Sequence, residues 1–126
     1  MRLLIIAAGG AIGALLRYTI AGLVQNWTGP NFPWGTLSVN LLGCFLIGLL
    51  FHYFETVPLS PNARSLIFVG GLGAFTTFST YGLESLNLLR DGQVRLGLLN
   101  VLGSNVLGIL FVFLGFTVAR LLLTHR

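Results

Sequence analysis

Residues 70–82 of the chain read Gly70-Gly71-Leu72-Gly73-Ala74-Phe75-Thr76-Thr77-Phe78-Ser79-Thr80-Tyr81-Gly82. This run holds four glycines, four serine or threonine hydroxyls and three aromatic rings. Glycine is a poor helix former, and threonine hydroxyls compete for backbone hydrogen bonds. The run therefore predicts a broken helix, with Thr77, Thr80 and Tyr81 sharing one helical face beyond the break. A continuous helix with internally bonded hydroxyls and packed rings is the alternative interpretation.

The composition around this run indicates a membrane protein. The chain has 126 residues, of which 55% are hydrophobic and only 8% are charged, against roughly 25% charged in soluble domains. A hydrocarbon core of about 30 Å takes about 20 apolar residues to cross. Four segments are long enough, at about residues 3–24, 37–54, 65–89 and 96–123. We expect one all-α integral membrane domain over residues 1–126, with four transmembrane helices and the third broken within the membrane.

Several classes of function are excluded by what the chain lacks. Its basic residues are seven scattered arginines with no lysine, which makes no phosphate-tracking patch for nucleic acid. The single cysteine, Cys44, excludes an internal disulfide and a multi-cysteine metal site. Ser79, the one serine that could act as a nucleophile, has no evident base near it in the sequence. We therefore expect no enzyme.

The orientation in the membrane is weakly encoded. An even number of spans places both termini on one side, and arginine counts set the orientation. Two interpretations stay open: a weakly set topology, or insertion in both orientations with antiparallel self-pairing. A cleavable signal peptide is disfavoured, because the first apolar run is too long and Arg17-Tyr18 interrupts it. The arginines on the side of the termini are Arg2, Arg64, Arg120 and Arg126, against Arg90, Arg95 and a snorkelling Arg17.

Polar side chains within the spans are candidates for function or for helix packing. Arg17 lies in the first span, where snorkelling to the interface is the simpler interpretation. Glu84 lies near the end of the third span, where a cap or an ion pair with an arginine is the simpler one. For the amides, the simpler interpretation is hydrogen bonding between helices. The remaining groups are Asn40 in the second span and Asn100, Ser104 and Asn105 in the fourth.

Glycine spacing predicts close contacts between helices, since small residues let membrane helices approach each other. The glycines concerned are Gly9 and Gly13 in the first span, Gly43 and Gly48 in the second, and Gly103, Gly108 and Gly115 in the fourth.

Three strings make the chain similar to a known family. They are Gly9-Gly10-x-x-Gly13-Ala14-x-x-Arg17-Tyr18, then Gly35-Thr36-Leu37-x-Val39-Asn40, then Gly70-x-x-Gly73-x-x-Thr76-Thr77-Phe78-Ser79-Thr80-Tyr81. In order and spacing they resemble the Fluc (CrcB-type) fluoride channels over nearly the whole chain.

The resemblance implies a fluoride-selective channel that exports fluoride passively across the cell (inner) membrane and lowers its toxicity inside the cell. It implies an antiparallel, dual-topology homodimer in membrane lipid, with two fluoride pathways. It further implies a structural Na⁺ ion at the dimer interface, held by the backbone carbonyls of Gly73 and Thr76. The expected partners are fluoride, a second copy of the chain and lipid, and not nucleic acid.

The resemblance also implies roles for individual side chains. Phe78 matches the first of two phenylalanine rings that face the anion, and Tyr81 stands where the family usually has the second. Asn40 matches a pore asparagine. A hydroxyl track is matched by Thr77, Ser79, Thr80 and, more weakly, Ser104, and vestibule positions are matched by Arg17 and Glu84.

Two alternatives to the channel remain. A small multidrug-type antiporter has a similar size and number of spans, but it needs a carboxylate in the first span, which has none. A non-transporting assembly subunit would show packing glycines without the string from Thr76 to Tyr81.

Overall fold

The computed structural model describes residues 1–124, and every regular element in them is helical. Arg126, one of the arginines counted for orientation, lies outside the described residues. The elements are α1 (Arg2–Thr28), α2 (Trp34–Thr56), α3 (Pro61–Arg64), the π-helix η1 (Ser65–Leu72), α4 (Gly73–Phe75), α5 (Phe78–Arg90) and α6 (Val94–Thr124).

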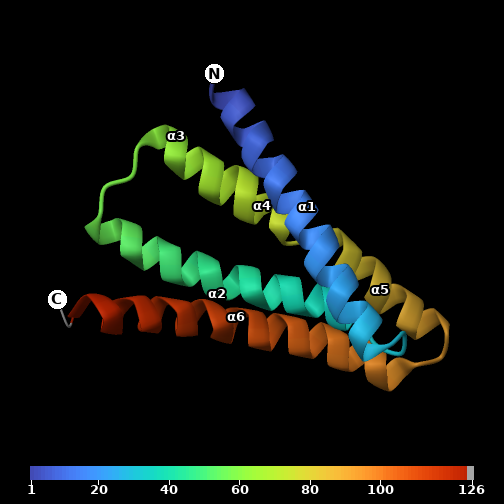
Figure 1. The fold of residues 1–126 in the computed structure, drawn as a ribbon. Helices are drawn as coiled ribbons and strands as arrows, with labels where there is room; N and C mark the ends of the chain where they lie inside the picture. Colours follow the sequence, from blue (N-terminus) through green and yellow to red (C-terminus); the bar gives the residue numbers. More distant parts are fainter. Residues whose placement is uncertain (125–126) are drawn as a thin grey trace.

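The described chain makes four passes that are long and apolar enough to cross a membrane. Three are the single helices α1, α2 and α6, and the third pass, Pro61–Arg90, is assembled from α3, η1, α4 and α5. The passes run in alternating directions and are joined by short connections at residues 29–33, 57–60 and 91–93 (Figure 1). The expected four-helix architecture is thus confirmed.

The helix ends follow ordinary rules. Gly29 and Gly92 have φ angles of 90° and 75° in the connections after α1 and α5, which glycine adopts without steric cost. Pro61 opens α3, where the missing N–H costs nothing, and the Ser60 hydroxyl caps the helix by accepting from the Ala63 amide at 3.2 Å.

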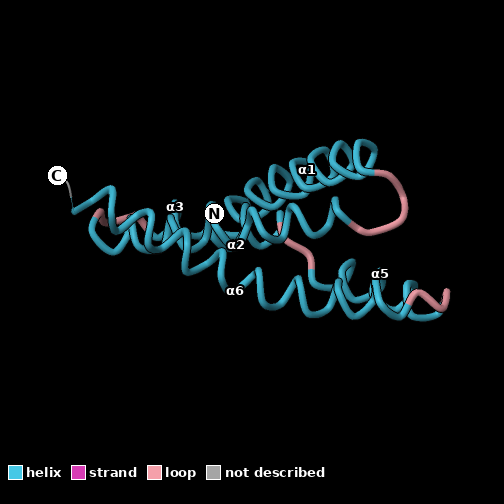
Figure 2. The backbone as a smooth tube through the Cα atoms, turned by 90° about the horizontal axis from the view of Figure 1, so that it is seen from below, coloured by secondary structure: helices cyan, strands magenta, loops and turns pink. Residues whose placement is uncertain are grey.

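The third pass is interrupted at two threonines. Thr76 and Thr77 have extended backbone angles, with φ/ψ of −90°/158° and −148°/116°. Figure 2 shows this segment as a short loop that offsets α5 from the helix before it. Gly70 and Gly71 remain helical in the π-helix, and Gly73 begins α4. The break therefore lies in the predicted segment, but the glycines do not open the helix, and the sequence did not indicate the π-helical geometry.

The glycines instead allow helices to touch. A side chain at Gly9 or Gly13 of α1 would collide with the backbone of Leu66 or Gly71 in η1. A side chain at Gly48 or Gly115 would likewise collide with the backbone of the facing helix, where α2 packs along α6 (Figure 1). Gly103 differs from the others, because a methyl group added there would meet no atom of the described residues within 4 Å.

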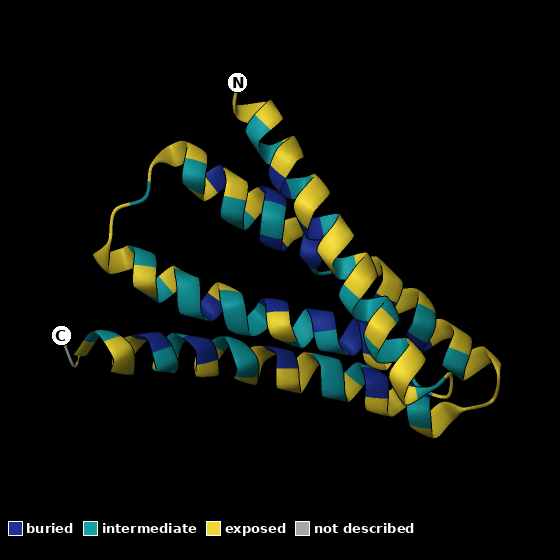
Figure 3. Cartoon of the chain, in the orientation of Figure 1, coloured by how far each residue is buried: buried dark blue, intermediate teal, exposed yellow. Residues whose placement is uncertain are grey.

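Few large side chains are buried. Leucines and other apolar residues remain exposed along all four passes (Figure 3). A soluble domain of this size would hide such side chains, so this surface suits lipid or another protein chain. The buried apolar residues are Leu37, Val39, Leu72, Phe75, Tyr81 and Ala119.

Candidate functional site

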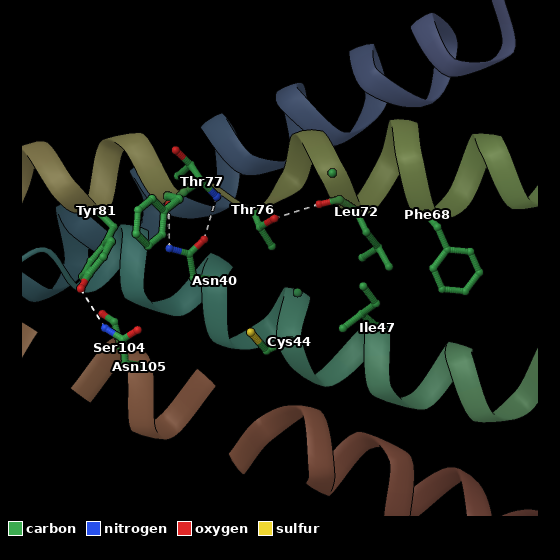
Figure 4. Close-up of a pocket in the computed structure, with 13 residues that line it drawn as sticks. Asn40, Cys44, Ile47, Phe68, Leu72, Thr76, Thr77, Tyr81, Ser104 and Asn105 are labelled. Atoms are coloured by element: carbon green, nitrogen blue, oxygen red, sulfur yellow. Dashed lines mark hydrogen bonds between the residues drawn. The ribbon is translucent and has the colours of Figure 1, made fainter. Parts of the chain in front are cut away.

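A groove of about 350 Å³ lies between α2, the broken third pass and α6 (Figure 4). It gathers many of the residues singled out in the sequence around the break. No acidic or basic side chain is among the described residues that line it. The lining residues are Asn40, Gly43, Cys44, Ile47, Phe68, Leu72, Gly73, Thr76, Thr77, Phe78, Tyr81, Ser104 and Asn105.

Asn40, on the neighbouring helix α2, stabilises the break by hydrogen bonds to its backbone. Its Nδ2 donates to the Thr77 carbonyl oxygen at 3.0 Å, and its Oδ1 accepts from the Thr77 amide at 2.8 Å. Both backbone groups of Thr77 are therefore paired without a helix, as Figure 4 shows. Since Asn40 has a second Nδ2 proton, one donor is left over beside the groove.

The same arrangement frees two backbone carbonyls. In an uninterrupted α-helix the amides of residues 77 and 80 would donate to the carbonyls of residues 73 and 76. Here the Thr77 amide donates to Asn40 instead, and the Thr80 amide donates to the Thr77 hydroxyl at 3.2 Å. The carbonyls of Gly73 and Thr76 thus lose their helical partners.

The hydroxyl of Thr77 caps α5. It accepts from the Thr80 amide and donates to the Thr80 hydroxyl at 2.9 Å. The Thr76 hydroxyl donates to the Leu72 carbonyl at 3.1 Å and so stays bound to its own helix. Ser79 is exposed and lines neither this groove nor the cavity described below.

Two aromatic rings stand side by side at the start of α5. The centroids of Phe78 and Tyr81 are 5.3 Å apart, and the ring planes are tilted by 56°. Phe78 is 80% exposed, whereas Tyr81 is only 8% exposed. The two positions are therefore not equivalent: one ring is free at the groove, and the other is packed into the protein.

Asn105 is a groove residue for which the sequence indicated only a polar packing group. Its Nδ2 donates to the Tyr81 hydroxyl oxygen at 2.9 Å and to the Val101 carbonyl at 2.7 Å. The sequence signal was present in the neighbouring polar pair Ser104-Asn105, but spacing alone did not show that Asn105 meets Tyr81.

A buried polar cluster joins α5 to α6 behind the groove. Asn100, which is 2% exposed, donates to the Ser85 hydroxyl at 2.9 Å, and Ser85 donates to the Tyr81 carbonyl at 2.8 Å. Ser104 donates to Asn100 at 3.4 Å and also lines the groove. For Asn100 the packing interpretation therefore matches its contacts.

A second cavity of about 360 Å³, also lined by Thr77, brings Arg17 and Glu84 together with Thr80. One carboxylate oxygen of Glu84 accepts from the Thr36 hydroxyl at 2.7 Å, and the other is buried without a partner. Of the two simpler interpretations of Glu84, a cap or an ion pair, no ion pair with an arginine is present among the described residues, and its one hydrogen bond is the one from Thr36. Thr77 lines both cavities.

The chain matches a known protein family over most of its length. Residues 4–116 match the family described as "CrcB-like protein, Camphor Resistance (CrcB)".

The chain belongs to this family. A relative from Magnetococcus marinus, "Fluoride-specific ion channel FluC", is 53% identical over 123 residues, covering 97% of this chain and 100% of the relative. Relatives of the same name from Salinibacter ruber and Aquifex aeolicus are 52% and 50% identical, covering 98% and 88% of this chain and 92% and 90% of themselves. The resemblance found in the three sequence strings is confirmed.

Proposed function

We propose that this CrcB-family chain is a fluoride-selective channel that exports fluoride passively across the cell membrane. The observation that carries the proposal is the groove at the break, lined by amide and hydroxyl groups and two aromatic rings, with no charged side chain among the described lining residues. The relatives named as fluoride-specific channels extend over nearly the full length of the chain. The chain acts as a transporter and not as an enzyme.

The chemistry of the groove suits a small anion. Fluoride holds its water tightly, so a permeation path must replace that water with hydrogen-bond donors. Asn40 keeps an unused N–H beside the groove, and the ring edge of Phe78 carries the positive end of the ring quadrupole. A lysine or arginine in the groove would bind the anion too firmly, since conduction requires release as well as entry.

The freed carbonyls support a structural Na⁺ ion. Oxygens of unwound backbone at a helix break are the ligands that transporters use for Na⁺. The hydrogen bonds described above leave the carbonyls of Gly73 and Thr76 without helical partners, so the donor set fits this cation. When bound, the ion would supply a fixed positive charge near the groove.

The assembly that fits these features is an antiparallel homodimer in a bacterial inner membrane. Phe78 is largely exposed and the groove is partly open, so a second chain is needed to complete an enclosed path. The nearly balanced arginines on the two sides favour insertion in both orientations. The antiporter alternative is not favoured, because no acidic residue occurs in the first pass and the relatives carry the name of a channel.

Transport from liposomes tests the function directly. The purified protein is reconstituted, and the release of fluoride and of chloride is measured with ion-selective electrodes. We expect rapid fluoride release and negligible chloride release. Release of neither ion from a folded protein would contradict the proposed channel function. Equal release of both ions would contradict the proposed selectivity for fluoride.

A further inference from the structure

Tyr81 carries a hydroxyl whose hydrogen-bond roles can be assigned from its neighbour. The Asn105 atom that lies 2.9 Å from the Tyr81 oxygen also lies 2.7 Å from the Val101 carbonyl. A carbonyl only accepts hydrogen bonds, so this atom of Asn105 is the amide nitrogen and not the amide oxygen. Its two protons then go to Val101 and to Tyr81.

The Tyr81 oxygen is therefore an acceptor toward Asn105, and its own proton remains available. Among the described residues no hydrogen bond has the Tyr81 hydroxyl as donor. Tyr81 and Asn105 both line the groove, as does Ser104 beside them (Figure 4). A hydroxyl that already accepts a hydrogen bond is a stronger donor, because hydrogen bonds in a chain polarise one another.

The ring has little freedom to turn this hydroxyl elsewhere. The side chain is 8% exposed, and its ring lies against Phe78. The backbone carbonyl of Tyr81 is fixed to Ser85, which is itself held by Asn100. The donor is thus set in place before an ion arrives.

We propose that Tyr81 determines specificity by donating its O–H to the anion in the groove, and that Asn105 is a positioning residue that orients and strengthens this donor. This inference rests on the proposed function and assigns a further contact within it. Fluoride gains more from such a donor than chloride does, because fluoride is the smaller ion and the stronger hydrogen-bond acceptor.

The test compares four proteins in the liposome experiment over a range of fluoride concentrations: the wild type, Tyr81→Phe, Asn105→Leu and the double variant. In Tyr81→Phe, which removes only the hydroxyl, the half-saturating fluoride concentration is expected to rise roughly tenfold, as for loss of one hydrogen bond to a charged group. Asn105→Leu is expected to raise it about threefold through the weakened donor. The double variant is expected to match Tyr81→Phe, because Asn105 acts only through Tyr81.

Tyr53→Phe is the matched control, since this tyrosine of α2 lines neither cavity and its loss of a hydroxyl should leave transport unchanged. Unchanged concentration dependence in Tyr81→Phe, in a preparation whose wild type transports fluoride, would overturn the inference and leave the channel function intact. So would an Asn105→Leu effect of equal size in both backgrounds.

A spectroscopic readout separates ion contact from a structural effect. The chain has three tyrosines, so ring-labelled tyrosine gives few NMR signals, and Tyr81→Phe assigns one of them. Added fluoride should shift the Tyr81 signal, and not that of Tyr53, which lines neither cavity, with a smaller shift in Asn105→Leu. A Tyr81 signal that is insensitive to saturating fluoride would overturn the inference even if the variants alter transport.

Discussion

At the scale of single residues, the side chains that line the groove differ in whether they also hold the fold together. Phe78 has an exposed ring with no structural partner except its neighbour, whereas Asn40 is committed to the Thr77 backbone. A change at the first position should therefore alter transport and leave folding intact. A change at the second should alter both.

Phe78→Ile removes the ring edge without changing charge. We expect fluoride efflux to fall roughly two- to tenfold, since a ring contact contributes about 0.5–1.5 kcal/mol and the apolar replacement offers no positive edge. The melting temperature should not move, because the side chain is 80% exposed. Phe113→Ile is the matched control on α6, where the ring is 66% exposed and outside both cavities. Full flux in Phe78→Ile would remove this ring from the path.

Asn40→Asp replaces the donor to the Thr77 carbonyl with a carboxylate oxygen. Two oxygens then face each other, and a negative charge stands beside the anion path. We expect fluoride efflux to be abolished and the protein to lose about 2–3 kcal/mol of stability, as when a buried acceptor loses its donor. Asn26→Asp, on the exposed end of α1, introduces the same charge elsewhere and should conduct normally. Wild-type efflux in Asn40→Asp would show that the residue only packs.

At the scale of elements, the break and the glycine contacts are separate structural features, built from different residues. The break is built from two extended threonines, an asparagine on α2 and a threonine cap. The glycines lie before it and bring η1 against α1. Each feature can be tested without touching the other.

Thr77→Val removes the cap of α5 while keeping the shape of the side chain. Loss of an N-cap costs about 1 kcal/mol, so the Thr80 amide proton should exchange with solvent roughly fivefold faster. Thr77→Ser keeps the hydroxyl and should protect the Thr80 amide as the wild type does. Equal exchange in all three proteins would show that the hydroxyl does not cap the helix.

Gly13→Ala and Gly10→Ala form a matched pair on α1. A methyl group at Gly13 would collide with the Gly71 backbone, but at Gly10 nothing lies within 4 Å. We expect the first to destabilise the protein by about 1–3 kcal/mol, as overpacking does, and the second to be neutral. Thermal unfolding in detergent measures both. Equal stabilities would place α1 and η1 further apart than the structure has them.

Much of the arrangement of helices could be predicted from the sequence. The positions of the four passes follow from apolar length, and a broken third pass follows from the glycine and threonine run. The two residues at which the helix opens within that run did not follow from the sequence, because glycine propensity is local while Thr77 is held by a side chain 37 residues away. The pairing of Tyr81 with Asn105 was equally hidden, since it depends on the rotation of α5 against α6.

At the scale of the whole molecule, the apolar surface is larger than the apolar core. Lipid can cover most of this surface, but a polar groove beside an exposed phenylalanine is better covered by another protein chain. The proposed dual-topology dimer would meet this need, and it makes a prediction about which ends of the passes face outward.

Cysteine labelling in intact cells tests that topology. In a Cys44→Ser background, Asn31→Cys and Asn62→Cys each place one thiol at opposite ends of the passes, in exposed positions. Dual insertion predicts that a membrane-impermeant maleimide labels about half of each variant, since both ends then face outward equally often. Complete labelling of one variant and none of the other would establish a single orientation.

The bond between Asn40 and Thr77 also bears on how the chain is made. Its two partners lie 37 residues apart, so the third pass on its own has nothing to pair the polar backbone that the break exposes. Because synthesis runs from the N-terminus, Asn40 and the rest of α2 are made before Thr77. The side chain that pairs with the backbone at the break is therefore available as soon as the third pass is made.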